Sequence, residues 1–232
     1  MDENMNVNDW RKYVKPTDGF ISRHINRRIS FKITSFIVSR KIPITPNHVS
    51  IISFLISIGA GIFYILKNPI IGGILVQLSS IIDGVDGELA RVLGKTSRFG
   101  GFLDAVLDRI ADIIIIATYA YFTANILSLG LNETLAVFTI VLTGDLLVSY
   151  IHARGEASLK KSPILIGKIP SFASRDVRLF IIFIGSIIGY FVPVANLLTL
   201  VAIGVLSYSY IISKTIDLYV HRKLFEEETH GD

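Results

Sequence analysis

The sequence contains no cysteine among its 232 residues. Neither a disulfide framework nor a thiolate metal site is therefore available to it. Charged residues are also scarce, at 18% of the chain, whereas hydrophobic residues make up 51%. This balance is too apolar for an ordinary soluble domain, and it indicates a membrane protein.

The sequence is rich in long apolar segments, which are separated by glycine, proline and short polar turns. Each comes close to the roughly 20 residues that a helix needs to cross a bilayer. They predict an all-α polytopic membrane protein with six transmembrane helices, over residues 49–66, 69–93, 100–126, 133–153, 176–194 and 196–220. We expect residues 49–220 to form this bundle, with a cytoplasmic segment 1–48 before it and a cytoplasmic tail 221–232 after it.

Lysine and arginine gather on one side of the predicted bundle. Nine of them precede the first span and six lie in the connection 154–178, whereas the turns at 127–132 and 191–197 contain none. Because basic residues mark cytoplasmic loops, we expect an integral protein of the cell membrane with both termini in the cytoplasm. The same distribution argues against nucleic-acid binding, since the basic residues flank spans instead of forming a patch on a soluble domain.

The segment before the first span has the pattern of an amphipathic helix over about residues 20–41. Isoleucine recurs every fourth residue from Ile21 to Ile37, and basic residues fall between the isoleucines. Such a helix is suited to lie in the cytoplasmic membrane interface. It either anchors the topology alone or also helps to shape a site.

Four aspartates interrupt two apolar spans between residues 83 and 108. Asp83 and Asp86 are three residues apart, and Asp104 and Asp108 are four apart, so each pair shares one helix face. At about 1.5 Å per residue, Asp86 lies roughly 10 Å inside the end of its helix and Asp108 roughly 12 Å inside the start of the next. The short connection makes these helices antiparallel neighbours, so the four carboxylates are expected to converge just below the cytoplasmic surface.

So many carboxylates at membrane depth require compensation. Each costs at least about 2.5–3.5 kcal/mol on insertion scales, and four together repel one another. Arg91 and Arg109 supply only two positive charges. Because Mg²⁺ and Mn²⁺ prefer oxygen ligands, the pattern predicts a site for one or two divalent cations that clamps phosphate oxygens. A structural polar cluster or a proton pathway is the alternative.

Small residues are registered with the aspartates. Gly87, Ala90, Arg91 and Gly100 complete the pattern D-x2-D-G-x2-A-R-x8-G-x3-D-x3-D without a departure. This pattern resembles the signature of the CDP-alcohol phosphotransferase family, membrane enzymes that include phosphatidylglycerophosphate and phosphatidylinositol synthases. The resemblance extends to the six spans, the N-terminal helix and the "TPN" at the start of the first span.

The resemblance implies a reaction and a role for each motif residue. A phosphoryl-alcohol group would pass from a CDP-alcohol donor to an acceptor hydroxyl, with release of CMP. Divalent cations, Mg²⁺ or Mn²⁺ and two per active site, would bind Asp83, Asp86, Asp104 and Asp108, and Asp108 would serve as ligand, general base or both. The resemblance also implies a homodimer. The residues that would bind the CDP moiety are Gly87, Ala90, Arg91, Gly100, Thr45 and Asn47.

The acceptor is indicated by arginines in the connection after the fourth span. Arg154, Arg175 and Arg178 are expected to line the cytoplasmic mouth of the cavity. Arginine forks suit phosphate oxygens, so a phosphorylated acceptor such as inositol phosphate or glycerol phosphate is expected. Alternatively, these arginines only mark a cytoplasmic loop.

Two further aspartates lie deeper in the spans. Asp112 is one helical turn beyond Asp108, and Asp145 lies midway along the fourth span at roughly the same depth. Both are expected to pair with Arg109, although Asp145 could instead contact an acceptor hydroxyl.

Two stretches narrow the resemblance to one branch of the family. Residues 15–30 and the "SRDVRLF" of residues 174–180 are similar to di-myo-inositol phosphate phosphate synthases, which join CDP-inositol to inositol 1-phosphate. The alternative within the family is a phospholipid head-group synthase that uses a CDP-diacylglycerol or CDP-archaeol donor. An ion transporter is the alternative from another class, since intramembrane carboxylates often mark ion paths. Uncharged outer halves of the spans, such as residues 113–122, argue against a transporter.

Overall fold

The computed structural model describes residues 14–222, and the regular elements in this range are all helical. A π-helical turn, η2 (Ser22–Asn26), leads into α1 (Arg27–Ser39). A short 3₁₀ helix, η3 (Pro163–Leu165), lies in the connection before α6. The longer helices are α2 (Pro46–Ile65), α3 (Pro69–Val92), α4 (Arg98–Leu127), α5 (Leu131–Leu159), α6 (Arg175–Phe191) and α7 (Val194–Val220).

Five of these helices are long and apolar enough to cross a membrane, namely α2, α3, α4, α5 and α7. Helix α6 has 17 residues, fewer than the roughly 20 that a span requires. The expected boundaries agree with the helices to within a few residues, except that α5 continues to Leu159, past its predicted end at residue 153. The structure is therefore an all-helical membrane bundle, and the sixth span stays a prediction.

Local sequence signals explain where the motif helices begin. The Thr45 hydroxyl accepts a hydrogen bond from the backbone N–H of His48 at 3.3 Å, and the His48 ring accepts one in return, so the pair forms a capping box at the start of α2. Ser97 caps α4 by accepting the backbone N–H of Gly100 at 2.9 Å. Gly94, at φ +62°, closes the turn between α3 and α4.

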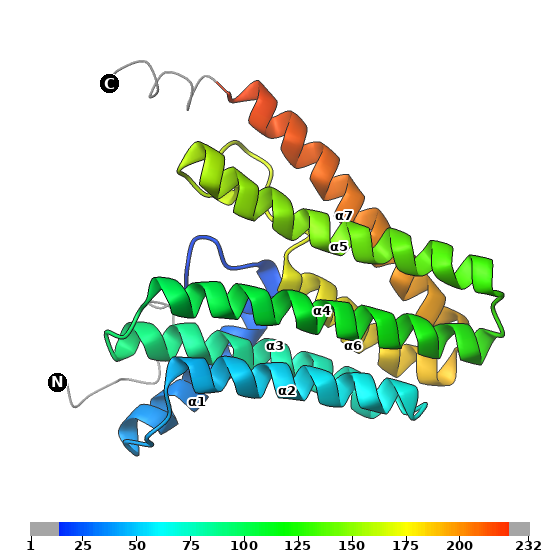
Figure 1. Cartoon of the computed structure of the whole chain (residues 1–232), viewed down its shortest axis with the longest axis horizontal. Coiled ribbons are helices and arrows are strands. Elements are labelled where there is room, and N and C mark those ends of the chain that lie inside the picture. The colour runs from blue at the N-terminus through cyan, green and yellow to red at the C-terminus, as the bar shows by residue number, and fades with distance from the viewer. Residues whose placement is uncertain (1–13, 223–232) are drawn as a thin grey trace.

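Figure 1 shows the arrangement, with the α3–α4 turn at the left; we call this side of the bundle the motif end. Helix α3 packs against α2 and α6, α4 packs against α2 and α5, and α5 packs against α7. Helices α3 and α4 pack closely on α2 and make few contacts with each other. They are joined by a short turn and run antiparallel, as expected, with room for cavities between them at the motif end.

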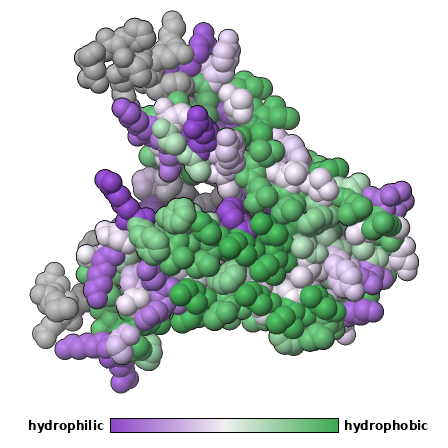
Figure 2. Space-filling view, in the orientation of Figure 1, coloured by the Kyte–Doolittle hydropathy of each residue, from purple (hydrophilic) through white to green (hydrophobic). Residues whose placement is uncertain are grey.

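Figure 2 shows a band of hydrophobic residues over the middle of the helices and hydrophilic residues at both ends. This is the pattern expected of a bundle whose middle lies in hydrocarbon. The surface is hollowed at the motif end, between α4 and α5.

The opposite end of the bundle has a closed core of aromatic residues. The rings of Tyr64 and Tyr119 lie 5.0 Å apart, and Phe122 packs beside both. The Tyr64 hydroxyl bonds to Ser186 at 2.7 Å, and the Tyr119 hydroxyl donates to Asn196 at 3.0 Å. Because these buried hydroxyls are paired, the end away from the motif is closed without unsatisfied polar groups on either tyrosine.

Helix α1 packs on α3 through polar side chains. Glu88 of α3 is fully buried and accepts hydrogen bonds from Arg27 at 2.9 Å, Ser30 at 2.7 Å and Thr34 at 2.7 Å. Arg27 also donates to both carboxylate oxygens of Asp18, at 3.0 and 2.9 Å. We call Asp18, Arg27, Ser30, Thr34 and Glu88 the Glu88 cluster. It fixes α1 and the segment before it to α3.

The isoleucine stripe expected on one face of a single helix is divided between two environments. The backbone is helical over residues 20–39, with the π-helical turn inside this range. Ile21 is 8% exposed, whereas Ile25 and Ile29 are 36% and 43% exposed. A repeat of four residues advances about 40° beyond a full turn at each step, so the stripe winds around the helix.

Helix α7 holds the connection that leads into α6. Lys214 is fully buried and donates to the carbonyls of Ile166 at 2.6 Å and Ile169 at 3.2 Å, and to Asp217 at 3.0 Å. Asp217 accepts the backbone N–H groups of Lys168 and Ile169, each at 3.1 Å. Because these buried groups are paired, the connection is fixed and places the start of α6 beside α3 and α4.

Candidate active site

Three of the four motif aspartates converge between α3 and α4. Asp83 comes from α3, and Asp104 and Asp108 come from α4. One carboxylate oxygen of each lies within 4.8 Å of the other two. All three are partly buried. We call these three residues the aspartate cluster, and their convergence confirms the expected geometry.

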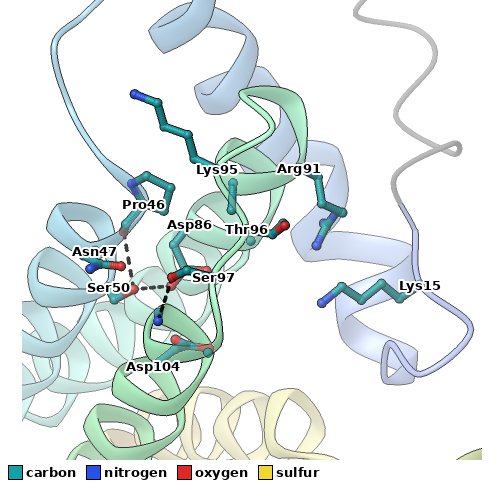
Figure 3. Close-up of a pocket in the computed structure, with 14 residues that line it drawn as sticks. Lys15, Pro46, Asn47, Ser50, Asp86, Arg91, Lys95, Thr96, Ser97 and Asp104 are labelled. Atoms are coloured by element: carbon teal, nitrogen blue, oxygen red, sulfur yellow. Dashed lines mark hydrogen bonds between the residues drawn. The ribbon is translucent and has the colours of Figure 1, made fainter.

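Asp86 lies beside the aspartate cluster in a different setting. It is 6% exposed, and its carboxylate accepts a hydrogen bond from the hydroxyl of Ser50 on α2. Figure 3 shows Asp86 and Asp104 at the same cavity, with Ser50 reaching Asp86 from α2. The fourth aspartate is thus adjacent to the other three and oriented by a neighbouring helix.

A cavity of about 180 Å³ opens beside Asp86 and Asp104 (Figure 3), and we call it the motif cavity. Five of the six residues that the family resemblance implies for CDP binding line the motif cavity: Asn47, Gly87, Ala90, Arg91 and Gly100. The sixth, Thr45, is exposed, caps α2 and does not line this cavity.

The motif cavity is suited to a negatively charged group. Nε and Nη2 of Arg91 are buried and have no hydrogen-bond partner within residues 14–222. A Cβ at Gly87 would lie 3.2 Å from Arg91 Nη1, and one at Gly100 would lie 2.9 Å from Ser97 Oγ and 3.2 Å from Asn47 Oδ1. Glycine therefore keeps the lining open beside the arginine. The N-terminus of α4 adds the favourable field of a helix dipole.

A second cavity, of about 430 Å³, lies in the hollow between α4 and α5. Asp104 lines both cavities, so the two meet at the aspartate cluster. We call the second one the arginine cavity. The charged residues of the motif helices and of α6 that line it are Asp83, Asp104, Asp108, Arg109, Arg175, Asp176 and Arg178.

Arg175, at the start of α6, contacts the aspartate cluster. Its Nη1 lies 3.0 Å from Asp108 and 3.3 Å from Asp83, and its Nε donates to Asp112 at 2.8 Å. One guanidinium therefore serves three carboxylates from two helices. The structure brings Arg175 to the mouth of the site, as expected, and places it against carboxylates.

Arg178 lies deeper than Arg175 in the arginine cavity. It is 2% exposed and donates to Asp145 at 2.6 Å and to the carbonyl of Ala173 at 2.5 Å. Its Nη2 has no hydrogen-bond partner among the described residues. Arg154, by contrast, is exposed and outside the lining of either cavity, although its neighbours Ala153 and Glu156 on α5 line the arginine cavity.

The deeper aspartates pair with arginines. Arg109 Nη1 lies 2.7 Å from Asp112, which confirms the expected pairing, and 3.7 Å from Asp145. The closer partner of Asp145 is Arg178. Both aspartates therefore neutralise arginines that line the arginine cavity.

Sequence reasoning missed Glu88 and the partners that bury it. A signal was present, because the insertion cost that singled out the aspartates applies equally to a glutamate in the same span. A search for the cation that compensates Glu88 would have pointed to the basic residues of α1, among which Arg27 is 7% exposed. Ser50 gave no such signal, since serine is common in apolar helices.

The donor atoms at the aspartate cluster suit a hard divalent cation. Mg²⁺, Mn²⁺ and Ca²⁺ all prefer oxygen ligands. Two oxygens bound to one ion are separated by at most twice the metal–oxygen distance, or about 4–5 Å. The carboxylates of Asp83, Asp104 and Asp108 meet this requirement with small side-chain movements. Asp86 lies outside this group of three but lines the motif cavity together with Asp104.

Comparison with known proteins agrees with this site. The model of the CDP-alcohol phosphatidyltransferase family matches residues 43–208. The "Bifunctional IPC transferase and DIPP synthase" of Thermococcus kodakarensis is 39% identical over 179 residues, which are 74% of this chain and 38% of that protein. The "Archaetidylinositol phosphate synthase" of Pyrococcus horikoshii is 38% identical over 144 residues, 62% of this chain and 70% of that one. The chain spans less than half the length of the bifunctional relatives.

Solved structures of a phosphatidylinositol phosphate synthase from Mycobacterium tuberculosis share the fold. The structure with CDP-DAG bound has a TM-score of 0.68 at 25% identity and covers 83% of this chain and 94% of that one. The structure with manganese and citrate has a TM-score of 0.68 at 24% identity, with 82% and 88% covered. Because the family match spans most of the chain and contains the whole aspartate motif, this chain belongs to the CDP-alcohol phosphatidyltransferase family.

Proposed function

We propose that this chain transfers a phosphoryl-alcohol group from a CDP-alcohol donor to the hydroxyl of a phosphorylated acceptor and releases CMP. The observation that carries the proposal is that two cavities meet at Asp104, with the aspartate cluster between them. Direct transfer between two substrates needs such an arrangement, because the acceptor oxygen must lie next to the donor phosphorus.

The motif cavity would hold the CDP part of the donor. The unpaired Nε and Nη2 of Arg91 would donate hydrogen bonds to diphosphate oxygens, which a planar guanidinium matches well. Gly87 and Gly100 would let the nucleotide lie against the backbone of α3 and α4. Asp83, Asp86, Asp104 and Asp108 would bind Mg²⁺ or Mn²⁺, two ions per site, which neutralise the diphosphate and stabilise CMP as it leaves.

Asp108 is the proposed general base, as the family resemblance implies. Its place in the lining of the arginine cavity and not of the motif cavity, a place that it shares with Asp83, supports this role. The acceptor hydroxyl would give its proton to Asp108 while its oxygen forms a bond to the phosphorus that carries the donor alcohol. The bond from this phosphorus to the oxygen that bridges to CMP would break. CMP would leave with that oxygen and the electron pair.

The charges of the arginine cavity support a phosphorylated acceptor. With divalent cations on the aspartate cluster, Arg175 would no longer be needed there. Arg109, Arg175 and Arg178 all line the arginine cavity, and Nη2 of Arg178 has no hydrogen-bond partner among the described residues. Guanidinium groups bind phosphate oxygens through paired hydrogen bonds, so these arginines suit a sugar or polyol phosphate.

We propose inositol phosphate as the acceptor and CDP-inositol as the donor, which would give di-myo-inositol phosphate phosphate. The similarity to the relative named DIPP synthase in Thermococcus kodakarensis supports this choice. A lipid donor is the second candidate. It is favoured by the similarity to the archaetidylinositol phosphate synthase and to the mycobacterial enzyme solved with CDP-DAG.

We also propose that six helices cross the membrane and that both cavities open on the cytoplasmic side. The distribution of lysine and arginine supports this orientation. On the N-terminal helix, Phe20 and Phe36 are 64% and 56% exposed and lie near exposed basic residues, which suits a helix in the membrane interface. The homodimer implied by the family resemblance stays a prediction.

The proposed function is tested with purified protein in liposomes containing Mg²⁺ or Mn²⁺. CDP-inositol, CDP-diacylglycerol and CDP-archaeol are supplied separately, each with inositol 1-phosphate or with glycerol phosphate, and CMP and products are identified by mass. We expect CMP and di-myo-inositol phosphate phosphate from CDP-inositol with inositol 1-phosphate. CMP release with lipid donors alone would establish the second candidate. Ion flux without CMP release from any pair would overturn the proposal and favour a transporter.

A further inference from the structure

A short segment before the first helix crosses the boundary between the two cavities. Lys15 lines the motif cavity, whereas Thr17, Asp18 and Gly19 line the arginine cavity. Both cavities share Asp104. The segment therefore lies over the place where donor and acceptor would meet.

The Glu88 cluster holds this segment on the side of α3. Asp18 accepts the backbone N–H of Lys15 at 2.9 Å and is bound by Arg27 through two hydrogen bonds. Arg27 in turn donates to Glu88. The residue before Glu88 in the sequence, Gly87, lines the motif cavity. The backbone of Lys15 is therefore tied to the helix that carries the motif.

Close packing at Gly19 holds the other end of the segment against α6. A side chain at Gly19 would collide with Asp176 and Ser174. The backbone N–H of Ser22 donates to Asp176 at 2.5 Å. With one end fixed to α3 and the other to α6, the segment has little freedom to move Lys15 away from the cavity.

The Lys15 side chain points into the motif cavity. Figure 3 shows its ammonium group directed toward the same space as the Arg91 guanidinium, opposite Asp104. Lys15 is exposed at the open side of the cavity, and partial burial of its ammonium group, and next the charge of Arg91, lower the pKa of Lys15. Two cations that repel each other thus share a cavity in which Nε and Nη2 of Arg91 have no hydrogen-bond partner among residues 14–222. A ligand with two or more negative charges would neutralise both cations.

We propose that Lys15 is a further donor-binding residue, which contacts the phosphate that bears the transferred alcohol. This inference rests on the proposed function, since it takes a CDP-linked donor as the ligand of the motif cavity. Of the two donor phosphates, the one that bears the alcohol must lie nearer the acceptor. Lys15 is next to the residues that line the arginine cavity, so it is placed to reach that phosphate while Arg91 serves the other.

The inference is tested by isothermal titration calorimetry of CDP and CMP binding to the full chain with Mn²⁺. We expect Lys15→Met to weaken CDP binding by about 10- to 100-fold and CMP binding by less than about threefold, because a charge-assisted hydrogen bond to the second phosphate is lost. Lys15→Arg should bind CDP within about threefold of the wild type. Lys32→Met, which removes an exposed lysine of α1, is the matched control.

Three outcomes would overturn the inference. The first is unchanged CDP binding by Lys15→Met, and the second is an equal loss for CDP and CMP. The third is an equal loss of CDP binding in Lys95→Met, since Lys95 also lines the motif cavity but its ammonium group points away from the space that Lys15 faces, so that its loss would report only the general charge of the cavity. If the wild-type protein bound neither nucleotide, the proposed function would fail, and the wild type alone would reveal it.

Discussion

The Glu88 cluster and the aspartate cluster, which each include one acidic residue of α3, differ in how their negative charge is compensated. In the Glu88 cluster, both carboxylate oxygens of Glu88 accept hydrogen bonds, one from Arg27 and Ser30 and the other from Thr34. In the aspartate cluster, Arg175 is shared between Asp83 and Asp108 and also serves Asp112. The first group is satisfied by the protein, and the second carries more negative charge than its neighbours neutralise.

Accessibility separates the two groups in the same way. Glu88 is fully buried, whereas Asp83, Asp104 and Asp108 are partly exposed and line cavities. A buried carboxylate that loses its partner is strongly destabilising, so Glu88 must be paired at all times. A carboxylate that faces a cavity can instead be compensated by a bound cation. The comparison therefore distinguishes carboxylates that stabilise the fold from carboxylates that are available to bind ligands.

The largest expected effect is on activity, from Asp108→Asn. We expect CMP release to fall by at least about 10³-fold, because both a metal ligand and a general base are lost. The thermal midpoint should stay the same or rise, since one negative charge is removed from a group of mutually repelling carboxylates. Turnover is followed by CMP release, and stability by thermal unfolding in detergent.

Glu133→Gln is the matched control for this change, since Glu133 is exposed at the opposite end of the bundle and its loss removes the same charge. A variant Asp108→Asn that keeps more than about a tenth of wild-type turnover would exclude Asp108 as the base.

Glu88→Gln, unlike Asp108→Asn, should lower the stability of the protein. It leaves Arg27 buried with one carboxylate partner instead of two, and we expect it to lower the free energy of unfolding by on the order of 3 kcal/mol. Unfolding in mixed micelles with increasing SDS measures this loss, with Asp83→Asn as the comparison. If Asp83→Asn were the more destabilising of the two, the assignment of structural and ligand-binding carboxylates would have to be reversed.

The same contrast explains what could be predicted from the sequence. The aspartate cluster was predictable because its members lie on two helices joined by a short turn, so spacing alone brings them to one depth. The Glu88 cluster was not, because Arg27 and Glu88 are 61 positions apart and nothing local distinguishes the buried Arg27 from its neighbour Arg28. Pairing between distant residues is decided by tertiary packing.

Helix positions followed from apolar runs and from glycine and proline, but packing between helices did not. The short turn between α3 and α4 predicted antiparallel neighbours, but it could not show that both helices pack on α2 and leave room for the cavities. The cap role of Thr45 also follows from local sequence, since threonine before proline is a common helix start. CDP binding by Thr45, which the family resemblance implies, stays a prediction.

Divalent cations should stabilise the protein through the aspartate cluster and Asp86, and not through the Glu88 cluster. At a cation concentration about 100-fold above its dissociation constant, the expected gain is about 2.7 kcal/mol, and EDTA should remove it. The gain should vanish in Asp83→Asn and persist in Glu88→Gln, although the latter starts from a lower stability. Thermal unfolding with and without Mn²⁺ measures the gain without reference to turnover. Equal stabilisation of wild type and Asp83→Asn would place the cation elsewhere.

The smallest expected effect concerns Asp18, the acidic member of the Glu88 cluster outside the helices. Burial raises the pKa of Asp18, but the hydrogen bonds and charge of Arg27 outweigh burial and hold that pKa below its ordinary value. A carboxyl whose pKa is lower in the folded than in the unfolded state contributes stability above about pH 4, and this contribution is lost as the pH falls through the folded value. The difference in thermal midpoint between wild type and Asp18→Asn should therefore shrink between about pH 6 and pH 3. A difference that stays constant over this range would mean that Asp18 holds Lys15 and Arg27 by hydrogen bonding alone, without its charge.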